Sequence, residues 1–403
     1  MVSTPKEKNE EHPVLKNADL FYKRLNEIAS KHPNPKENYF GAAPNIFIGK
    51  KGYPNLNVGF LSNEHVDASY DSPKLWYEQK YDIPQIVSKR SYLVNSNFTT
   101  HIKSFDDRFM EKVREIALSS KPVDVEVSLT KKPHYKLEVG PDITPYGPSI
   151  KLKKAEITEN AKVPQKVEKV YSQDDFRAQG AIEYLSDSFD EHYLTKLLSG
   201  GTLGLKSQRK LVPTRWSITA VDDMLGKKDI KKIRDYPNRT DYEVYTGEYM
   251  GNFYFIMFFP ELWSYELFET YMPNDALKLK EIKSFTDFEG YGGRKEYAYN
   301  TMGGYYAARI GVTEHLSARK KQGAALLLRF VTDDYWVPLG VWVVRQTVRT
   351  TLANKPLVFG SKDLMIKYAQ ALIKKKFGYD VNKILSESKL LKYFKSQTKL
   401  FDF

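Results

Sequence analysis

The sequence predicts an α+β protein in which a mixed sheet core with flanking helices is divided between two lobes. Helical and β-rich segments alternate irregularly, no internal repeat or heptad pattern occurs, and 403 residues are enough for two domains. We expect four regions along the chain. These are a charged N-terminal arm at 1–35, an N-terminal lobe at 36–154, a C-terminal core lobe at 155–384 and a flexible tail at 385–403.

The N-terminal lobe is predicted from two strand signals and one helix signal. The run PNIFIGKKGYPNLNVGFLS places β-rich pieces on both sides of a Gly-Tyr-Pro turn, which predicts a hairpin. DDRFMEKVREIALSS predicts a helix with Phe109, Val113 and Ile116 on one face. VDVEVSL alternates as a half-buried strand does, and the glycines and prolines of EVGPDITPYGPS predict a loop.

The C-terminal lobe is predicted from a polar linker followed by mixed elements. Residues 155–169 are polar and are expected to join the lobes, and the next segment has helical character up to Gly200 and Gly201. EVYTGEYMGNFYFIMFF predicts a second hairpin whose apolar arm is a central strand. GGYYAARIGVTEHLSARKKQG predicts a helix, and AALLLRFV predicts a buried strand.

Composition excludes several classes of function. The chain has no cysteine, which excludes disulfides, thiolate catalysis and Cys-ligated zinc, and its seven histidines show no metal-ligand spacing. The polar start lacks a signal-peptide core, and the longest apolar run, Phe253 to Phe259, is too short to cross a bilayer. These features predict a soluble cytoplasmic protein with no membrane partner.

The charge balance is positive, with 62 Lys plus Arg against 50 Asp plus Glu and a formal net charge of +12. Such a balance favours polyanions, nucleic acid above all, although a solvated lysine-rich surface explains it equally well. The 28 tyrosines suit stacking on bases as well as a protein core.

The run RKLVPTRWSITAVDD combines basic, aromatic and acidic residues. If it is a strand, the neighbours Arg215 and Trp216 face opposite ways, and Asp222 and Asp223 end the segment where carboxylates could hold a divalent cation. The alternative is a core strand followed by an Asp-capped helix.

The run DFEGYGGRKEYAYNTMGGYYAAR is rich in glycine and tyrosine. A helix that starts after Gly303 and Gly304 would offer free N–H groups to an anion such as a mononucleotide phosphate, near Arg294 and Arg309. It matches neither the Walker A nor the dinucleotide pattern, and a tight turn packed with tyrosines is an equal alternative.

The segment VPLGVWVVRQTVRTTL leaves helix and strand open, because valine favours strands. A helix would bury Val341, Val344 and Val348 in one stripe. The residues Trp342, Arg345 and Arg349 would then share another face, which suits phosphate or base contact unless acidic residues of the chain pair with the arginines.

A metal-dependent nuclease or phosphodiesterase is one hypothesis from these motifs. It needs carboxylates that hold Mg²⁺ or Mn²⁺ and cations near the developing charge. The candidate metal ligands are Asp222, Asp223 and Glu289, and the candidate phosphate ligands are Arg215, Arg294 and Arg309. No catalytic residue is assigned.

The chain ends on SQTKLFDF, which places Gln397, Leu400 and Phe403 at i, i+3 and i+6. This spacing matches the motif Q-x-x-L-x-x-F by which proteins bind DNA sliding clamps. The usual motif has a second aromatic after the first, and here Phe401 can partly replace it.

Most of the chain resembles the Nre family of archaeal DNA repair proteins. The resemblance is carried by FIGKKGYPNLNVG, SPKLWYEQKYDIPQIVSKRSYLV, LSGGTLGLKSQRKLVPTRWSITAVDD, GGYYAARIGVTEHL and PLGVWVVRQTVR, in that order. It implies a role in repair of DNA damage and binding of the sliding clamp PCNA through the tail. Some members carry an N-terminal Cys₄ zinc segment, which this chain lacks.

Three functions follow from these observations. The first is a clamp-recruited DNA repair factor at the nucleoid that binds DNA through Arg- and Tyr-rich surfaces, with or without nuclease activity. The second is a nucleotide-binding enzyme or sensor that uses the Gly/Tyr-rich loop. The third is a non-catalytic adaptor that only brings partners to the clamp.

Overall fold

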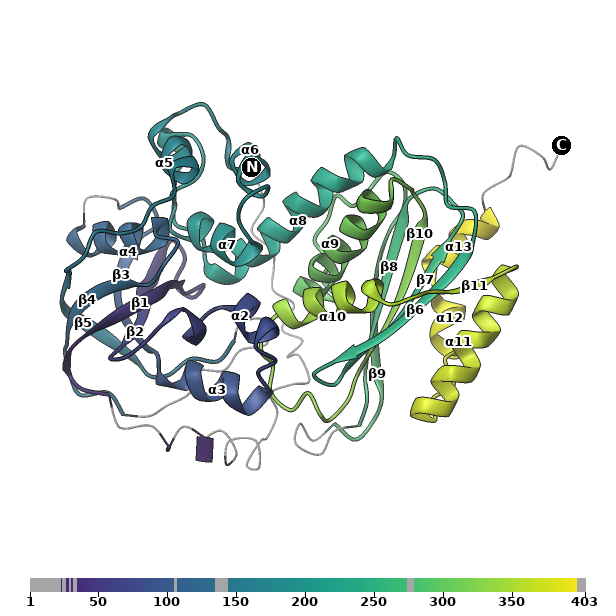
Figure 1. Cartoon of the computed structure of the whole chain (residues 1–403), viewed down its shortest axis with the longest axis horizontal. Coiled ribbons are helices and arrows are strands. Elements are labelled where there is room, and N and C mark those ends of the chain that lie inside the picture. Colours follow the sequence, from purple (N-terminus) through teal and green to yellow (C-terminus); the bar gives the residue numbers. More distant parts are fainter. Residues whose placement is uncertain are drawn as a thin grey trace.

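The computed structural model describes residues 35–104, 107–134, 144–273 and 279–396, with a few single positions between residues 23 and 31. Almost all of the predicted N-terminal arm lies outside these ranges. The four predicted clamp-binding residues, Gln397, Leu400, Phe401 and Phe403, also lie outside them. The described part has an α+β fold with two sheets, as the sequence predicts (Figure 1).

The first lobe, here called the barrel lobe, is a closed barrel in the order β1-β2-β3-β5-β4. Only β3 and β5 pair in parallel, and the other neighbours are antiparallel. The barrel interior packs against the apolar face of α4, which presents Met110, Val113 and Ile116. The elements are β1 (Asn38–Ile48), β2 (Asn55–Asn63), β3 (Val94–His101), α4 (Arg108–Leu118), β4 (Val123–Leu129) and β5 (Ser149–Ile157).

The predicted hairpin and the predicted alternating strand are both confirmed in this lobe. Ile48 pairs with Val58 across the first turn, and the side chains of β4 alternate between buried and more exposed positions. Between β2 and β3 the chain forms the short elements η2 (Ala68–Tyr70), α2 (Pro73–Glu78) and α3 (Ile83–Tyr92). The predicted lobe boundary after residue 154 falls inside β5.

Four helices lead from the barrel to the second sheet. They are α5 (Gln165–Ser172), α6 (Ala178–Leu185), α7 (Glu191–Ser199) and the long α8 (Thr214–Ile233), with the 3₁₀ turn η3 (Lys206–Gln208) before α8. Figure 1 shows α8 running from the barrel lobe to the sheet lobe. The prediction of a strand around Arg215 to Asp223 is therefore wrong. Apolar residues recur there at helical spacing, for example Val221 and Leu225, and the helix buries them against α6, α7 and α9.

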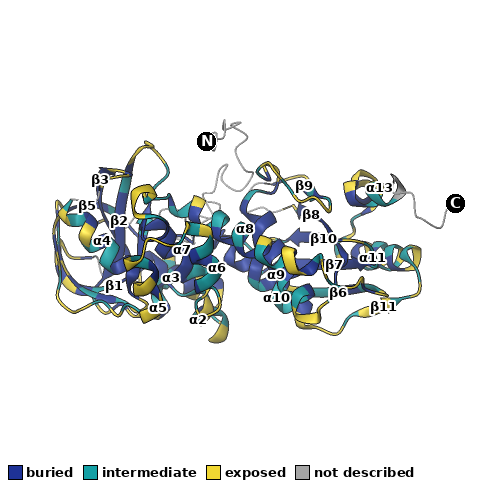
Figure 2. Cartoon of the chain, turned by 90° about the horizontal axis from the view of Figure 1, so that it is seen from above, coloured by how far each residue is buried: buried dark blue, intermediate teal, exposed yellow. Residues whose placement is uncertain are grey.

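The second lobe, here called the sheet lobe, has one six-stranded sheet in the order β11-β6-β7-β10-β8-β9. Helices α8, α9 and α10 cover one face, and α11, α12 and α13 cover the other. Figure 2 shows the central strands β7, β8 and β10 buried between these layers. The elements are β6 (Tyr242–Tyr249), β7 (Asn252–Phe259), β8 (Ser264–Tyr271), β9 (Lys283–Glu289), α9 (Met302–Arg319), β10 (Ala324–Val331), α10 (Trp342–Ala353), β11 (Leu357–Phe359), α11 (Lys362–Phe377), α12 (Asn382–Glu387) and α13 (Lys389–Ser396).

Several predictions for this lobe are confirmed and one is corrected. The second hairpin is β6–β7, AALLLRFV is the fully buried β10, and the valine-rich segment is the helix α10. Helix α9 starts at Met302, before Gly303 and Gly304, so both glycines lie in its first turn rather than ahead of it. The predicted tail region begins inside α12, and Leu385 and Leu390 are buried on the sheet.

Candidate functional site

The predicted phosphate ligand Arg309 lies between two of the predicted metal ligands. Its guanidinium is buried, and it forms ion pairs with Glu289 at 2.9 Å and with Asp223 at 2.5 Å. Asp223 also pairs with Lys227 at 2.6 Å. Gly226 of α8 provides the space, because a Cβ at that position would lie 3.2 Å from Nε of Arg309. The structure thus brings these residues together as an ion-pair group that an arginine occupies.

The third predicted metal ligand, Asp222, pairs with another predicted phosphate ligand. Both oxygens of this fully buried carboxylate accept from Nη1 of Arg345, at 2.6 and 2.9 Å. Burial raises the pKa of Asp222 to about 6, although the charge of Arg345 opposes the shift. This pair joins α8 to α10 and lies apart from the ion pairs of Arg309.

The predicted ligand Arg349 connects three helices. It binds Glu314 of α9, with Nε to Oε2 at 2.8 Å, and it forms an ion pair with Glu191 of α7. Burial of Glu191 disfavours its ionised form, but the charges of Arg349 and Arg345 lower its pKa to about 2. Both arginines of α10 therefore pair with acidic residues of the chain, which is the alternative to phosphate or base contact.

Arg294 fixes the loop after β9. Its guanidinium donates to the backbone carbonyls of Phe288, Glu296 and Tyr297, and it pairs with Asp287 at 2.8 Å. Among the described residues, no group of three His, Cys, Asp or Glu side chains is arranged to hold a metal ion. The carboxylates predicted to bind Mg²⁺ or Mn²⁺ are therefore already paired with arginines.

Two glycines of the Gly/Tyr-rich run, Gly303 and Gly304, lie tightly against protein side chains, whereas Gly292 has, among the described residues, no atom beyond its chain neighbours within 4 Å of where a Cβ would stand. A Cβ on Gly304 would lie 2.3 Å from a carboxylate oxygen of Glu269, and one on Gly303 would lie 3.1 Å from Val341. Gly311 meets Val348 in the same way at 2.8 Å. These glycines let α9 pack closely on α10 and on the sheet, which is the structural alternative to a mononucleotide site.

The three remaining predicted residues lie nearer the junction of the lobes. Trp342 is buried and packs edge-on against Trp76, with ring centroids 5.4 Å apart. Arg215 lies in the first turn of α8, with Nη2 at 3.6 Å from the sulfur of Met302. Trp216 is 39 % exposed beside the ring of Tyr53, at a centroid distance of 5.6 Å.

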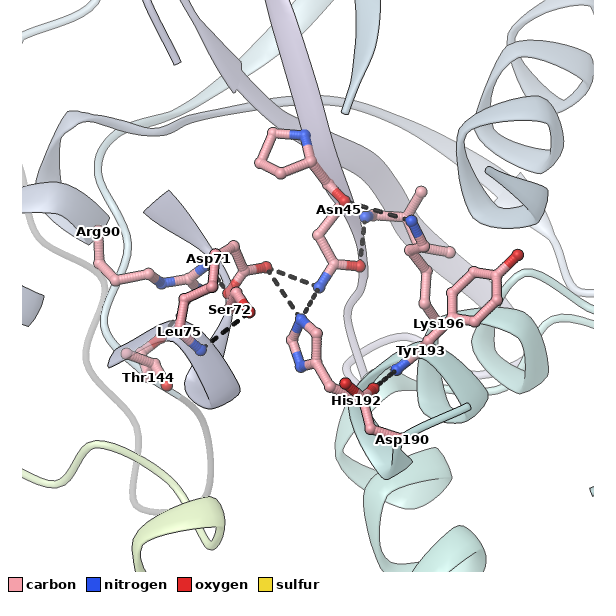
Figure 3. A network of polar contacts seen from close by, with 12 residues as sticks. Asn45, Asp71, Ser72, Leu75, Arg90, Thr144, Asp190, His192, Tyr193 and Lys196 are labelled. Atoms are coloured by element: carbon pink, nitrogen blue, oxygen red, sulfur yellow. Dashed lines mark hydrogen bonds and ion pairs between the residues drawn. The ribbon is translucent and has the colours of Figure 1, made fainter. Parts of the chain in front are cut away.

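A pocket at the lobe junction, with both polar and apolar residues in its lining, was not predicted from the sequence. Its volume is about 70 Å³, and elements of both lobes line it. Figure 3 shows the network on its barrel side. The lining includes polar side chains from β1, α3, α7, α8 and α10 and from two connecting segments, namely Asn45, Asp71, Arg90, Thr144, His192, Thr195, Lys196, Ser199, Thr214 and Arg345.

Asp71 is the centre of this network. Its Oδ1 pairs with Arg90 at 2.6 Å, and its Oδ2 accepts from the Asn45 amide at 2.6 Å. The Asn45 amide also lies 3.1 Å from Nε2 of His192, and Thr144 donates to the carbonyl of Leu339 at 2.5 Å. The network holds the barrel, α3, α7 and the loop before α10 in register.

Lys196 supplies a positive charge to the same pocket. Its ammonium donates to the carbonyls of Ser119 and Pro44, at 2.6 and 3.3 Å. Burial lowers the pKa of Lys196 to about 8, so the side chain stays mainly protonated at neutral pH. Arg90 and Arg345 are balanced by Asp71 and Asp222, and the charges of Asp71 and Asp190 partly offset the Lys196 ammonium.

One sequence signal could have indicated part of this pocket. Lys196 stands in the run HYLTKLLS between Leu194 and Leu197, so it interrupts an apolar helix segment. A lysine in such a place is either buried with partners or functional. Asn45, Asp71 and His192 stand in unrelated segments, and only the tertiary fold brings them together.

Comparisons with known proteins match most of the chain to one family. Residues 12–277 match the family model described as Archaeal Nre, N-terminal, and residues 289–403 match Archaeal Nre, C-terminal. The chain is 38 % identical over 323 residues to "DNA repair protein NreA" of Haloferax volcanii, which covers 77 % of each chain. It is 35 % identical over 337 residues to "DNA repair protein NreA" of Archaeoglobus fulgidus, with 83 % of this chain and 84 % of the relative covered.

A third relative and the search of solved structures complete the comparison. The chain is 33 % identical over 363 residues to "DNA repair protein NreB" of Archaeoglobus fulgidus, covering 88 % of this chain and 89 % of the relative. No solved structure matches the chain significantly. Within the described residues, no helix combines the length and apolar character that a membrane span requires.

Proposed function

We propose that this chain, which belongs to the archaeal Nre family, is a DNA repair factor that binds DNA at the nucleoid and is recruited to the PCNA sliding clamp by its C-terminal motif. The names of its relatives support the repair role. The net charge of +12 supports binding to a polyanion.

The position of the motif is the observation that carries the clamp proposal. Helix α13 is held on the sheet lobe by the buried Leu390, and it ends at Ser396 on the outer side of that lobe (Figure 1). Gln397 follows directly, and Leu400 and Phe403 complete the spacing. A short segment that binds with two apolar anchors must be accessible to its partner, and the end of α13 that precedes the motif in the sequence lies on the outer side of the lobe.

The test is a titration of the full chain against the sliding clamp of the same organism by calorimetry. Leu400→Ala/Phe403→Ala should weaken binding at least tenfold, because buried apolar anchors dominate such contacts. The control, Thr398→Ala/Lys399→Ala, changes only the variable positions and should bind as the unmodified chain does. Unchanged affinity of the first variant would contradict the proposal.

The proposal concerns binding rather than cleavage. For Asp223 and Glu289 to hold a cation, Arg309 would have to leave two short ion pairs in a buried site. Incubation of labelled DNA with the protein in Mg²⁺, Mn²⁺ and chelator tests this. Metal-dependent cleavage that Asp223→Asn abolishes would restore the nuclease hypothesis.

A second candidate function is a site for a small anion such as phosphate in the junction pocket, whose volume of about 70 Å³ is too small for a mononucleotide. The buried ammonium of Lys196 favours it. Millimolar phosphate should be tested for a rise in melting temperature, with AMP and ATP as larger anions for comparison. A rise that His192→Ala reduces would support this site, and the absence of any rise would eliminate it.

A further inference from the structure

The barrel has the topology of an OB-fold. Its closed strand order β1-β2-β3-β5-β4, the parallel β3–β5 pair and the helix α4 between β3 and β4 are the features of that fold. OB barrels bind single-stranded nucleic acid across β2 and β3, with the β1–β2 turn at the edge of the site. This topology could not be predicted from the sequence, because sequence patterns indicated only the first hairpin and the strand β4 in this lobe.

We propose that the outer ends of β2 and β3, the β1–β2 turn and the first turn of α8 form a platform for single-stranded DNA. The proposal rests on the proposed DNA-binding function and names the site that performs it. The platform is defined by Lys51, Tyr53, Lys103, Lys210 and Trp216, with Asn55, Asn57, Thr99 and His101 on the adjoining strand surface.

Two exposed rings form its stacking surface. Tyr53 in the β1–β2 turn is 40 % exposed and Trp216 on α8 is 39 % exposed. Their rings contact at a centroid distance of 5.6 Å and an interplanar angle of 45°. Two large rings that stay partly exposed to water do not gain the free energy of full burial. Stacking of bases on such rings is a common way in which proteins bind single strands without regard to sequence.

Backbone hydrogen bonds bring three basic segments beside the rings. The amide of Ile102 donates to the carbonyl of Pro54 at 3.0 Å, and the amide of Leu211 donates to the carbonyl of Ile102 at 2.9 Å. The amide of Ile48 donates to Oγ1 of Thr214 at 2.9 Å, which fixes the start of α8 against β1. Lys103 and Lys210 adjoin Ile102 and Leu211, and Lys51 stands in the turn that contains Pro54. The three segments therefore lie side by side, and all three lysines are exposed.

The electrostatics of the three segments are one-sided. Residues 49–58, 94–104 and 192–221 contain no aspartate or glutamate. Within the described part of the chain, Lys51, Lys103 and Lys210 form no ion pair with a carboxylate. The arginines of α9 and α10 differ from these lysines, because carboxylates of the protein balance their charges. The lysine charges therefore remain available to phosphates.

The adjoining strand surface is polar and only partly open. Asn55 pairs with His101 and Asn57 with Thr99 across β2 and β3, which places these four side chains on one outward face with donors and acceptors for bases. The other half of the same face is covered, since Gly147 and Pro148 bond to the backbone of Leu93 and Asn95. The open half suits a short single strand of a few nucleotides. The bases of a duplex are already stacked on one another, so their faces are not free to stack on the rings.

The test measures binding of a fluorescein-labelled oligothymidylate of about 15 nucleotides to the full chain by anisotropy, with a hairpin duplex in parallel. We expect preference for the single strand. Tyr53→Ala/Trp216→Ala should weaken binding at least tenfold, and Tyr53→Phe/Trp216→Phe should retain most of it, because phenylalanine still stacks.

The charge arm of the test uses Lys51→Ala/Lys103→Ala/Lys210→Ala. This variant should lower the slope of log K against log salt by about 2, since each phosphate contact to a single strand contributes about 0.7. The matched control removes the same charge from the far lobe, as Lys367→Ala/Lys375→Ala/Lys383→Ala, and should keep the slope. Melting temperatures equal to that of the unmodified chain establish that the variants fold.

The outcomes separate this inference from the function on which it rests. If the unmodified chain binds no DNA at all, the proposed DNA-binding function fails. If it binds the single strand and both platform variants bind equally well, the platform is refuted while DNA binding stands. Equal affinity for the duplex and the single strand would refute the assignment of single-stranded DNA.

Discussion

The ion pair between Asp222 and Arg345 offers a measurement that separates a structural role from a metal-binding one. The carboxylate is fully buried between α8 and α10, and one guanidinium nitrogen contacts both of its oxygens. We consider the single variants Arg345→Met and Asp222→Leu and the double variant that carries both. Each replacement is apolar and similar in size to the side chain it removes.

The magnitudes follow from burial. Arg345→Met leaves a charged carboxylate without its partner inside the protein, which should cost about 3–5 kcal/mol in the free energy of unfolding. In the intact pair, burial still raises the pKa of Asp222 from 3.8 to about 6. That difference corresponds to a net penalty of about 3 kcal/mol on the ionised form at neutral pH. The double variant removes this penalty, so its stability should equal or exceed that of the unmodified protein.

The assay is urea unfolding at pH 7, followed by far-UV circular dichroism and by tryptophan fluorescence. The two lobes share the junction network, and coincident transitions from the two probes are required before the data are treated as two-state. The reasoning is refuted if Arg345→Met costs less than about 1 kcal/mol, or if the double variant loses the sum of the two single losses. If Asp222 is instead a metal ligand, Mg²⁺ should raise the midpoint of the unmodified protein and leave that of Asp222→Leu unchanged.

Three further predictions concern the core and the junction pocket. Trp76→Ala removes a fully buried ring that packs on Trp342, and urea unfolding should show a loss of about 3–5 kcal/mol. Gly311→Leu places atoms within 2.8 Å of Val348, so forced separation of α9 and α10 should cost about 1–3 kcal/mol and lower the melting temperature; an unchanged melting temperature would disprove the close packing. Because the pKa of Lys196 falls from 10.5 to about 8 on folding, the unfolded state binds more protons between these values, and stability should rise by about 3 kcal/mol from pH 8 to pH 10.5. Lys196→Met should flatten that rise, and an equally steep rise in the variant would assign it to other groups.

Local periodicity predicted those elements whose buried side chains recur along one segment. The stripe of Val341, Val344 and Val348 packs against the sheet, as a helix requires, and the apolar arm FYFIMFF is the central strand β7. The first hairpin was predicted because its turn residues are local to it. In each case the information lies within about twenty residues of sequence.

Local patterns did not predict the correct secondary structure where tertiary contacts determine it. The run TRWSITAV has β-branched residues that suit a strand, but its continuation to Ile233 buries one face on three other helices, and the segment is helical. Closure of the barrel depends on the pairing of β1 with β4, which is separated from it by about eighty residues. No spacing within the sequence indicates such a pairing.

Three of the predicted DNA ligands have carboxylate partners within the protein, and the reason is chemical. A planar guanidinium with five donors is suited to buried pairing with carboxylates, so arginines that stand on helix faces beside apolar stripes tend to be absorbed by the fold. Arg309, Arg345 and Arg349 illustrate this, since each contacts one or two acidic side chains. Sequence alone gives no partner for them, because carboxylates that they contact, Asp223, Asp222 and Glu314, stand 86, 123 and 35 residues away along the chain.

The arginines that pair with carboxylates and the lysines that do not lie in different parts of the molecule, and this difference indicates where DNA should bind. If the buried arginines are neutralised within the protein, they contribute little to the salt dependence of DNA binding, and the lysines of the barrel turn and its neighbours must account for it. Of the seven predicted nucleic-acid ligands, Arg215 and Trp216 belong to the acid-free segment 192–221, and Trp216 has an exposed ring. The most specific run of the sequence, VPTRWSITAVDD, thus divides into two parts. Its first half faces the platform, and its second half carries the acids that hold the helices of the sheet lobe together.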